Sequence, residues 1–337
     1  MSSKKEWVLN AFAGQTVEQV PVGFWHHFTT ETEWTQGLTD PEIYQKNLAG
    51  HRQFLADVQP DFIKLMSDGF FDYPNEAFKA ELKDFKDLKE IKPLPANHPW
   101  FSQQVQLIKE IKASFSEDIV TLYNIFAPAT HLKWKLADHV SRGDSLFADF
   151  LEEAPEVLKL VLDAIAQDLA KLVTKIIKEA EVDGIYLSVQ NIQDKRVSPN
   201  DYAEFVKPSE YQVLKAANQA GGTNILHICG YEGATNNLEV YRDYPAQVFN
   251  WAVTSENISL SEGRQLFGGK TVLGGFNNTK EGLLYNGSKE EIQAAVKELL
   301  NQAGRQGTLI GADCTVPSDI DPQRIWWVKE AAKAELN

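Results

Sequence analysis

The chain has 337 residues, of which 43% are hydrophobic and 24% charged, and its formal net charge is -14. A chain of this length fits a single (β/α)₈ barrel and can bury most of its apolar surface without disulfide bonds. The acidic balance argues against a nucleic acid or an anionic membrane surface as a partner, because both attract basic proteins. The chain has no apolar run near the ~20 residues that span a bilayer and no secretory signal, so we expect a cytoplasmic protein.

Short apolar runs alternate with longer amphipathic segments along the whole chain. Eight of these runs have the composition of β-strands: Val20–Trp25, Phe62–Met66, Ile119–Ile125, Gly184–Val189, Asn224–Ile228, Gln247–Trp251, Thr271–Gly275 and Thr308–Ile310. Alternation of strands and helices is typical of a parallel sheet. Eight such units predict an α/β protein with the fold of a (β/α)₈ TIM barrel, in one domain that covers residues 1–337.

Helical spacing is clearest in two of the intervening segments. Apolar residues recur every three or four positions in Ala154–Ala180, and Glu290–Gly304 closes on a glycine, which is a common C-terminal signal. We expect a short helix to end at Val240–Tyr244. The stretch Asp72–Trp100 is irregular and rich in Lys, Glu and Pro, and we interpret it as an insertion over the top of the barrel.

Barrel topology brings the residues that follow each strand to one cavity, because active sites of this fold lie at the C-terminal ends of the strands. The residues at these positions are His26, His27, Asp68, Asn124, Ser188, Gln190, His227, Cys229, Asn250, Trp251, Asn277, Asp313 and Cys314. The polarity of loops does not by itself predict histidines and both cysteines at strand ends, so a metal or catalytic site is expected there.

His227, Cys229 and Cys314 are the candidate metal ligands. His227 and Cys229 are two positions apart on an expected strand, so their side chains point to the same side. Cys314 follows the last expected strand and would face the same cavity. Two thiolates and one imidazole suit a tetrahedral Zn²⁺ ion and leave its fourth position open, as in catalytic zinc sites. A thiol that entered this position would lose its proton and become a nucleophile.

The spacing alone leaves a second interpretation open. Both cysteines could be small buried hydrophobic residues, with His227 a hydrogen-bonded residue of the core. A disulfide between the cysteines is conceivable, although cytosolic thiols are normally kept reduced.

With these motifs the chain resembles the uroporphyrinogen decarboxylase superfamily, and within it the branch of zinc-dependent methylcobalamin:coenzyme M methyltransferases. The segments Leu226–Gly230 and Asp313–Pro317 are similar to the zinc motif of that branch, and the resemblance extends over nearly the whole chain. It implies a zinc ion held by His227, Cys229 and Cys314. It also implies a methylcorrinoid such as methylcobalamin as methyl donor, on a corrinoid protein as partner, and a small-molecule thiol as acceptor.

The match to the decarboxylases of this superfamily is incomplete. Their arginine-rich segment after the first strand, which binds the substrate's carboxylates, is replaced here by Phe24–Thr29, which has no arginine. Their catalytic aspartate is matched by Asp68, their active-site tyrosine falls near Trp134, and their late histidine falls at Cys314. Because a polyanionic tetrapyrrole needs cationic residues and its decarboxylation needs no metal, these differences point away from that reaction.

The match to the methyltransferase branch also has gaps. Tyr231 stands where an asparagine is commoner, and Gly274–Asn278 differs from the Gly-Asn-Ile/Val-Asp pattern of that branch. These differences concern the acceptor thiol and leave the metal motif intact.

The sequence therefore predicts methyl transfer from a methylcorrinoid to a zinc-activated thiol. Asp68 is the candidate catalytic residue, with the capping of a turn as the alternative role. The candidate substrate-binding residues are His26, His27, Trp134, Gln190, Asn250, Trp251 and Asn277. Strand alternation would place only one of the two histidines in the cavity, and Trp251 is either a stacking surface or a core residue.

Two other functions stay open. One is a decarboxylase, and the other is a metal- or corrinoid-binding accessory protein without turnover, whose fourth zinc position would be filled by a side chain of the protein. Trp326 and Trp327, in the last expected helix, serve either core packing or the surface of a homodimer.

Overall fold

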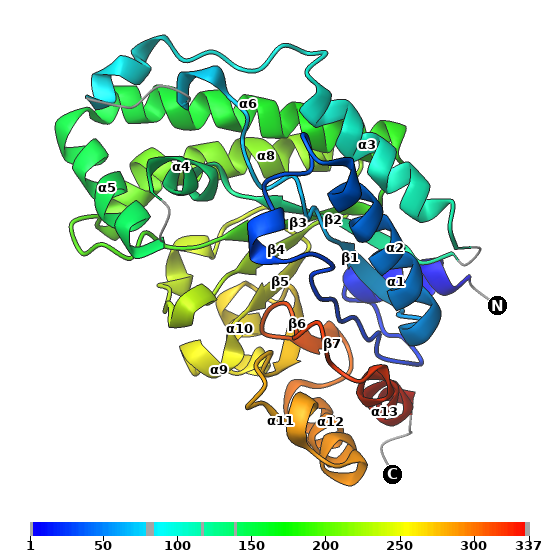
Figure 1. Ribbon diagram of the computed structural model, residues 1–337. Helices are drawn as coiled ribbons and strands as arrows, with labels where there is room; N and C mark the ends of the chain where they lie inside the picture. The colour runs from blue at the N-terminus through cyan, green and yellow to red at the C-terminus, as the bar shows by residue number, and fades with distance from the viewer. Residues whose placement is uncertain (1–2, 79–83, 116–117, 138–139, 334–337) are drawn as a thin grey trace.

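The computed structural model describes residues 3–78, 84–115, 118–137 and 140–333, arranged around a central parallel sheet (Figure 1). The sheet has seven strands in the order of the chain: β1 (Phe62–Leu65), β2 (Val120–Phe126), β3 (Gly184–Val189), β4 (Ile225–Ile228), β5 (Val248–Trp251), β6 (Thr271–Phe276) and β7 (Thr308–Ala312). Each strand pairs in parallel with the next. A curled parallel sheet of this order, joined by helices on its outside, is a TIM-barrel-like fold.

Seven of the eight predicted strands are confirmed, with ends that differ by at most two residues. The prediction of a strand at Val20–Trp25, the first along the chain, is wrong. This segment forms a single parallel bridge, between Val22 and Ile310 of β7. On its other side, the backbone N–H of Asp61, just before β1, donates to the carbonyl of Val22. The segment therefore lies between β7 and β1 without forming a ladder.

The reason lies in the residues of this segment. Pro21 has no N–H to donate, and the N–H of Val22 donates to the Asp61 carboxylate at 2.9 Å instead of to a strand carbonyl. At Gly23, an added Cβ would lie 2.5 Å from the ring of Phe62. The backbone can therefore approach the sheet closely here, and it exchanges hydrogen bonds with Ile310 of β7. On the side of β1, the N–H of Val22 is used by a side chain, so a ladder does not form there.

The interior of the curled sheet is filled by one apolar cluster. Its inward-facing strand residues are Phe62, Val120, Leu122, Tyr186, Ile225, Val248, Leu273 and Leu309. Helix α1 (Lys4–Phe12) adds Phe12, whose ring meets that of Phe62 edge-on at 5.2 Å between centroids. Because Phe62 begins β1, this contact closes the N-terminal end of the sheet. The opposite end of the sheet, at the C-terminal ends of the strands, is where a functional site of this fold is expected.

Helices surround the sheet (Figure 1). The longer ones are α2 (Pro41–Val58), α3 (Pro99–Lys112), α5 (Val140–Glu153), α6 (Pro155–Glu179), α8 (Lys207–Gln219), α12 (Lys289–Ala303) and α13 (Pro322–Lys333). The shorter ones are α4 (Pro128–Leu136), α7 (Pro199–Asp201), α9 (Val253–Glu256), α10 (Leu260–Leu266) and α11 (Leu283–Asn286). Single turns are η1 (Glu31–Glu33), η2 (Glu76–Phe78), η3 (Phe85–Glu90), η5 (Tyr231–Gly233) and η6 (Leu238–Tyr241), and η4 (Tyr202–Val206) is a π-helix.

The two clearest predicted helices are confirmed as α6 and α12. Helix α12 starts with a capping box between Ser288 and Glu291, and it ends at Gly304, whose φ of 74° favours glycine. The predicted helix end at Val240–Tyr244 is the shorter 3₁₀ turn η6. Of the described helices, none combines the length and the apolar character that a membrane span requires.

The irregular stretch Asp72–Trp100 carries the turns η2 and η3, and its residues 79–83 lie outside the described residues. Part of it packs on helices outside the sheet. The N–H of Leu94 donates to Asp168 of α6 at 2.7 Å, and the ring of Phe85 stacks on Phe150 of α5 at 4.5 Å. Figure 1 shows this segment in cyan beside α6 and α5. Its interpretation as an insertion stays a prediction.

Candidate metal centre and substrate cavity

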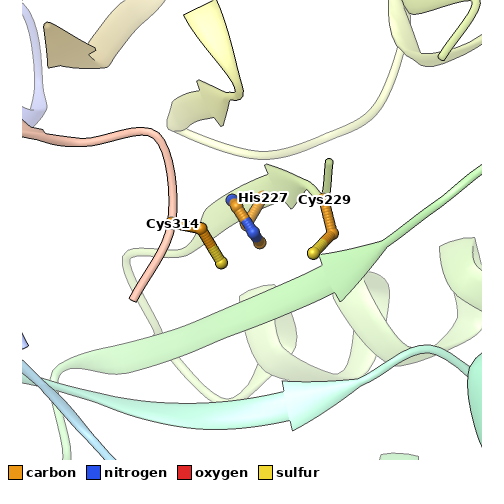
Figure 2. Close-up of side chains that lie close together, drawn as sticks. All are labelled: His227, Cys229 and Cys314. Carbon is orange, nitrogen blue, oxygen red and sulfur yellow. The ribbon is translucent and has the colours of Figure 1, made fainter. Parts of the chain in front are cut away.

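The three candidate metal ligands come together at the C-terminal ends of β4 and β7. His227 lies in β4, Cys229 follows this strand, and Cys314 follows β7. Their ligand atoms all lie within 4.8 Å of one another, and both cysteines are free thiols. Figure 2 shows the two sulfur atoms and the imidazole facing a common space. Among the residues that the structure describes, this group has three members and no fourth candidate ligand.

The backbone fixes both cysteines. The N–H of Cys229 donates to the carbonyl of Val189 at 2.8 Å, which continues the ladder between β3 and β4 by one residue. The N–H of Asp313 donates to the carbonyl of Phe276 at 2.8 Å, and this bond holds the start of the loop that carries Cys314. Both sulfur atoms are therefore carried by backbone that is tied to the sheet.

Asn250 determines which nitrogen of His227 is available. These two residues pair across β4 and β5, and Nδ1 of His227 donates to Oδ1 of Asn250 at 2.5 Å. The hydroxyl of Tyr186 donates to the same oxygen at 2.6 Å. Nδ2 of Asn250 donates to the carbonyls of Leu273 and Ala312, which fixes the orientation of the amide. The proton of His227 thus lies on Nδ1, and Nε2 keeps its lone pair.

Nε2 of His227 is buried and has no hydrogen-bond partner. A buried polar atom without a partner costs about 1–3 kcal/mol, so this atom needs an explanation. A metal ion bound by this lone pair and by the sulfur atoms of Cys229 and Cys314 provides one. The donor set and the tautomer of His227 fit zinc, which prefers nitrogen and sulfur ligands.

The two sulfur atoms shift each other's pKa in opposite directions. The hydrogen bond from the Cys229 thiol holds the pKa of Cys314 well below its ordinary value. The same hydrogen bond, together with burial, raises the pKa of Cys229 well above its ordinary value. The lowered pKa of Cys314 favours its thiolate, which is the form of cysteine that binds metals.

A cavity of about 550 Å³ opens beside these residues. Eight of the strand-end and site residues predicted from the sequence line it: His27, Asn124, Trp134, Ser188, Gln190, His227, Cys229 and Cys314. The volume is within the range of small-molecule sites. One side of the cavity carries the candidate metal ligands. Another consists of Trp34, Phe71, Phe126 and Trp134, which we call the aromatic wall.

The rings of the aromatic wall support one another. Phe126 meets Phe71 and Trp134 at 4.5 and 4.7 Å between ring centroids, and Phe71 stacks on Trp134 at 5.8 Å. The imidazole of His27 packs on Trp34 at 4.2 Å. Such a wall offers apolar surface and excludes water from this side of the cavity.

His27 and Asp68 form a hydrogen-bonded pair beside the cavity. Nδ1 of His27 bonds to Oδ1 of Asp68 at 2.8 Å, and the N–H groups of Phe28 and Thr29 donate to Oδ2. Asp68 is 0% exposed and does not line the cavity. A catalytic role of Asp68 therefore stays a prediction, and any such role would act through His27. Asp68 orients His27, which leaves Nε2 of His27 as the nitrogen available to a ligand.

His26 turns away from the cavity, as strand alternation predicts for one of the two histidines. Its Nδ1 bonds to the carbonyl of His27 at 2.9 Å, and its ring packs on Phe28 and Phe54. Burial lowers its pKa. His26 does not line this cavity, and its predicted contact with a substrate stays untested.

Three more predicted substrate residues do not line the cavity. Asn250 is buried behind His227 and orients it, as described above. Trp251 is a core residue. Its ring packs against Gly263 so closely that a Cβ added to this glycine would lie 2.1 Å from the ring, and its Nε1–H donates to the carbonyl of Ile258. Oδ1 of Asn277 accepts from the N–H of Thr279 at 2.7 Å and caps a turn. None of these three residues lines this cavity, and their predicted contact with a substrate stays untested.

Lysines that line the cavity were not anticipated from the sequence. Nζ of Lys133, on α4, donates to Asp144 at 2.8 Å and to Gln190 at 3.2 Å. Lys135 is paired with Asp72. Nothing in the sequence around these two indicated the cavity.

Lys64 could have been identified from the sequence as a candidate site residue, because it is a charged residue inside the apolar run of β1. Its Nζ lies 4.5 Å above the ring of Tyr186 and 5.4 Å above that of Trp25. Burial lowers its pKa to about 8. The inward position of a lysine in a strand was therefore the feature that could have identified this residue.

Residues 73–335 match the family model described as uroporphyrinogen decarboxylase (URO-D), and the chain belongs to this family. No curated protein matches the sequence.

Among solved structures, the chain is similar to a methyltransferase from Methanosarcina mazei, with 17% identity, a TM-score of 0.72 and coverage of 98% of both chains. It is also similar to a B12-independent methionine synthase from Shewanella sp. W3-18-1 in complex with selenomethionine, with 12% identity, a TM-score of 0.56 and coverage of 94% of this chain and 96% of that one. A β-1,4-mannanase from the sea hare Aplysia kurodai matches at 10% identity and a TM-score of 0.50, over 94% and 92% of the two chains. At such identities the likeness shows the fold alone.

Proposed function

We propose that the protein transfers a methyl group from a methylcorrinoid, such as methylcobalamin, to a small-molecule thiol at a zinc ion held by His227, Cys229 and Cys314. The observation that carries this proposal is the unpaired Nε2 of His227, within 4.8 Å of two cysteine sulfurs at the edge of a cavity. Bound there, zinc would lower the pKa of a thiol at its open position and so supply a thiolate nucleophile.

The surrounding residues prepare this donor set. Asn250 holds His227 with its proton on Nδ1, so that Nε2 needs no rearrangement to act as a ligand. Cys229 and Cys314 must both be thiolates to act as ligands, so zinc binding would release the protons that their thiol groups carry. With three protein ligands, the fourth coordination position of the metal is open to a substrate. In an accessory protein with four protein ligands, this position would be filled.

His27 has the geometry of a proton acceptor for a ligand in the cavity. Its Nδ1 is bound to Asp68, and its other nitrogen is available. A proton accepted at Nε2 would create an imidazolium, which the buried Asp68 carboxylate stabilises. In this proposal His27 takes the proton of the incoming thiol, either directly or through water.

The aromatic wall is the proposed surface for the methyl donor. A corrin ring is a large apolar face with a polar periphery, and Trp34, Phe71, Phe126 and Trp134 offer apolar rings on which such a face can pack. We infer that the donor is presented by a corrinoid protein at the open end of the cavity.

We also infer that the segment 20–25 occupies the position of the eighth strand of a (β/α)₈ barrel, through its bridge to β7.

The comparisons support this proposal through the family and the fold. We place the chain in the branch of zinc-dependent methylcobalamin:coenzyme M methyltransferase-like proteins, because its His-x-Cys and Cys residues meet in one cluster. The similar fold of a protein named as a methyltransferase agrees with this placement. Decarboxylation of a polyanionic substrate is less well supported, because Lys133 and Lys135 are already paired with Asp144 and Asp72.

A methyl-transfer assay tests the proposal. Zinc-loaded protein is incubated with methylcobalamin and a panel of thiols, and the loss of the methylcobalamin spectrum and the appearance of methyl thioethers are followed together. We expect thioether formation with at least one thiol, and its loss after chelation and return on adding zinc. Thioether formation that is unaffected by chelation would contradict the role of zinc, and no reaction with any thiol would favour an accessory protein.

A further inference from the structure

Lys64 is a buried cation next to the candidate metal ligands. Its side chain points inward from β1, lines the cavity and is 4% exposed. Its Nζ donates to Oγ1 of Thr315 at 3.3 Å, and Thr315 directly follows Cys314 in the chain. The ring of Tyr186, below Nζ at 4.5 Å, in turn stacks on the imidazole of His227 at 5.0 Å.

No carboxylate within the described ranges lies within 4.0 Å of Nζ of Lys64, in contrast to the other two lysines of the cavity. Lys133 is paired with Asp144, and Lys135 with Asp72. An uncompensated buried charge is costly, so a lysine at this place needs an opposing charge nearby. The two aromatic rings around it compensate only in part.

The groups near Lys64 that can carry a negative charge come from three parts of the fold. They are Asp68 beyond β1, Cys229 beyond β4 and Cys314 beyond β7, and each stabilises the charged form of Lys64. Asp68 already accepts from three donors. The sulfur atoms of the metal site are therefore the remaining groups whose negative charge can offset the positive charge of Lys64.

A count of formal charges shows what this arrangement does once a zinc ion is bound. Two thiolates and a neutral imidazole cancel the charge of Zn²⁺. The charge of Lys64 then has no opposing charge among the metal and its protein ligands, and the other negative group near it, Asp68, is already bound by His27 and by two backbone N–H groups. A neutral fourth ligand leaves the metal, its ligands and Lys64 with a net positive charge, and an anionic fourth ligand makes this group neutral.

We propose, building on the zinc-dependent function above, that Lys64 is a positioning residue that makes the fourth position of the metal site prefer an anionic ligand, so that the substrate thiol binds as its thiolate. In the transfer, the sulfur forms a bond to the methyl carbon with its own electron pair. The bond from that carbon to the donor breaks, and its electron pair stays with the donor. The product is a neutral thioether, which no longer offsets the charge of Lys64. The same residue therefore favours binding of the substrate over that of the product.

Ligand binding to the cobalt-substituted full-length protein tests this proposal apart from activity. Azide serves as the anionic probe, imidazole as the neutral probe, and the visible spectrum of cobalt reports their binding. The variants are Lys64→Gln and Lys64→Met, with Lys64→Arg as the conservative change. Lys135→Gln is the matched control, because Lys135 lines the same cavity but is paired with Asp72.

We expect the affinity for azide to fall at least about tenfold in Lys64→Gln and Lys64→Met, and that for imidazole to change less than about twofold. Lys64→Arg should restore most of the preference, and Lys135→Gln should leave it unchanged. The pH at which 2-mercaptoethanol, a thiol without a charged group, binds as thiolate should rise by about one unit in Lys64→Gln, since one unit is a tenfold change.

Two results would overturn the inference in distinguishable ways. If the wild-type protein binds no stoichiometric metal, the metal site and the role of Lys64 fail together. If the metal is retained but azide and imidazole weaken equally in the Lys64 variants, or neither weakens, the proposed function stands and Lys64 is a structural residue.

Discussion

Two buried polar clusters of this protein are built from similar parts but are completed in different ways. The first, which we call the mouth cluster, consists of Tyr186, His227 and Asn250 at the end of the sheet. The second, the tyrosine cluster, surrounds Glu210 on α8, whose carboxylate accepts from Tyr202 and Tyr244. Both clusters use tyrosine hydroxyl groups to stabilise a buried acceptor.

The difference between them is in what they leave unpaired. In the tyrosine cluster both carboxylate oxygens of Glu210 have partners, and the hydroxyl groups of Tyr202 and Tyr241 bond to each other at 3.1 Å. In the mouth cluster, Nε2 of His227 is left without a partner beside two sulfur atoms. Because buried polar atoms are normally paired, a completed cluster indicates a structural role and an incomplete one indicates a ligand. Four predictions test this contrast.

The largest effect is expected from removing a sulfur ligand. Cys229→Ser and Cys314→Ser should lower the zinc content from one ion per chain to near zero, measured by elemental analysis. Methyl transfer should fall by more than about 1,000-fold, because the thiolate nucleophile forms only at the metal.

The control for these variants is His51→Gln. His51 is also fully buried, but both of its nitrogens are paired, with the carbonyl of Asn47 and the N–H of Met66. We expect this variant to lose about 1–3 kcal/mol of stability and to keep its zinc. Stoichiometric zinc in both cysteine variants would show that the site is not formed by these residues.

The second effect concerns the pH dependence of stability. Burial raises the pKa of Glu210 to about 7, from an ordinary value of 4.5. The folded state therefore holds a proton that the unfolded chain has lost between these two pH values. Its contribution to stability is present below pH 4.5 and is lost as the pH rises to about 7, by about 3 kcal/mol in total.

Glu210→Gln removes this titration and should flatten the corresponding part of the pH dependence. The measurement is the free energy of unfolding in urea at several pH values, compared between the variant and the wild type. Zinc content and methyl transfer should not change, because Glu210 does not line the cavity. An identical dependence in both proteins would show that Glu210 is ionised in the folded state throughout this range.

The third effect compares two residues of the mouth cluster. Asn250→Ala removes the acceptor that holds His227 with its proton on Nδ1, and zinc affinity should fall by about 10–100-fold. Tyr186→Phe removes the other donor to the same oxygen and leaves the bond to His227 in place, so zinc affinity should change little. Competition with a chelator of known affinity measures both. Equal losses in the two variants would mean that the stability of the cluster, and not the orientation of His227, controls binding.

Much of the candidate metal site could be predicted from the sequence, because the relevant signals are local. The positions of His227 and Cys229 follow from strand alternation, and that of Cys314 follows from the end of a strand. The partner of His227 could not be predicted, because contact with Asn250 depends on the register between β4 and β5. The sequence places Asn250 at a strand end but does not tell whether it faces the cavity or a neighbouring side chain.

The fold shows the same limit. Alternating apolar runs predicted β1 to β7 well, since their side chains face two apolar layers. The segment 20–25 has the same apolar composition but forms a single bridge to β7, because Pro21 has no N–H and the N–H of Val22 donates to the carboxylate of Asp61. Asp61 lies about forty positions away along the chain, so only the folded structure brings the two together.

The smallest effect is expected on the aromatic wall. Like the unpaired nitrogen of His227, its rings face the cavity and are available to a ligand. Trp134→Leu removes a ring that stacks on Phe71 and lines the cavity, and KM for methylcobalamin should rise several-fold, by about 1 kcal/mol or less. Zinc content should stay at one ion per chain. Trp327→Leu on α13 is the matched control, since Trp327 does not line the cavity and packs beside Arg324. A rise in KM that is confined to Trp134→Leu would place the donor on the aromatic wall. An unchanged KM with a lower kcat would instead mean that this wall positions the thiol, and the corrinoid would have to approach from another side.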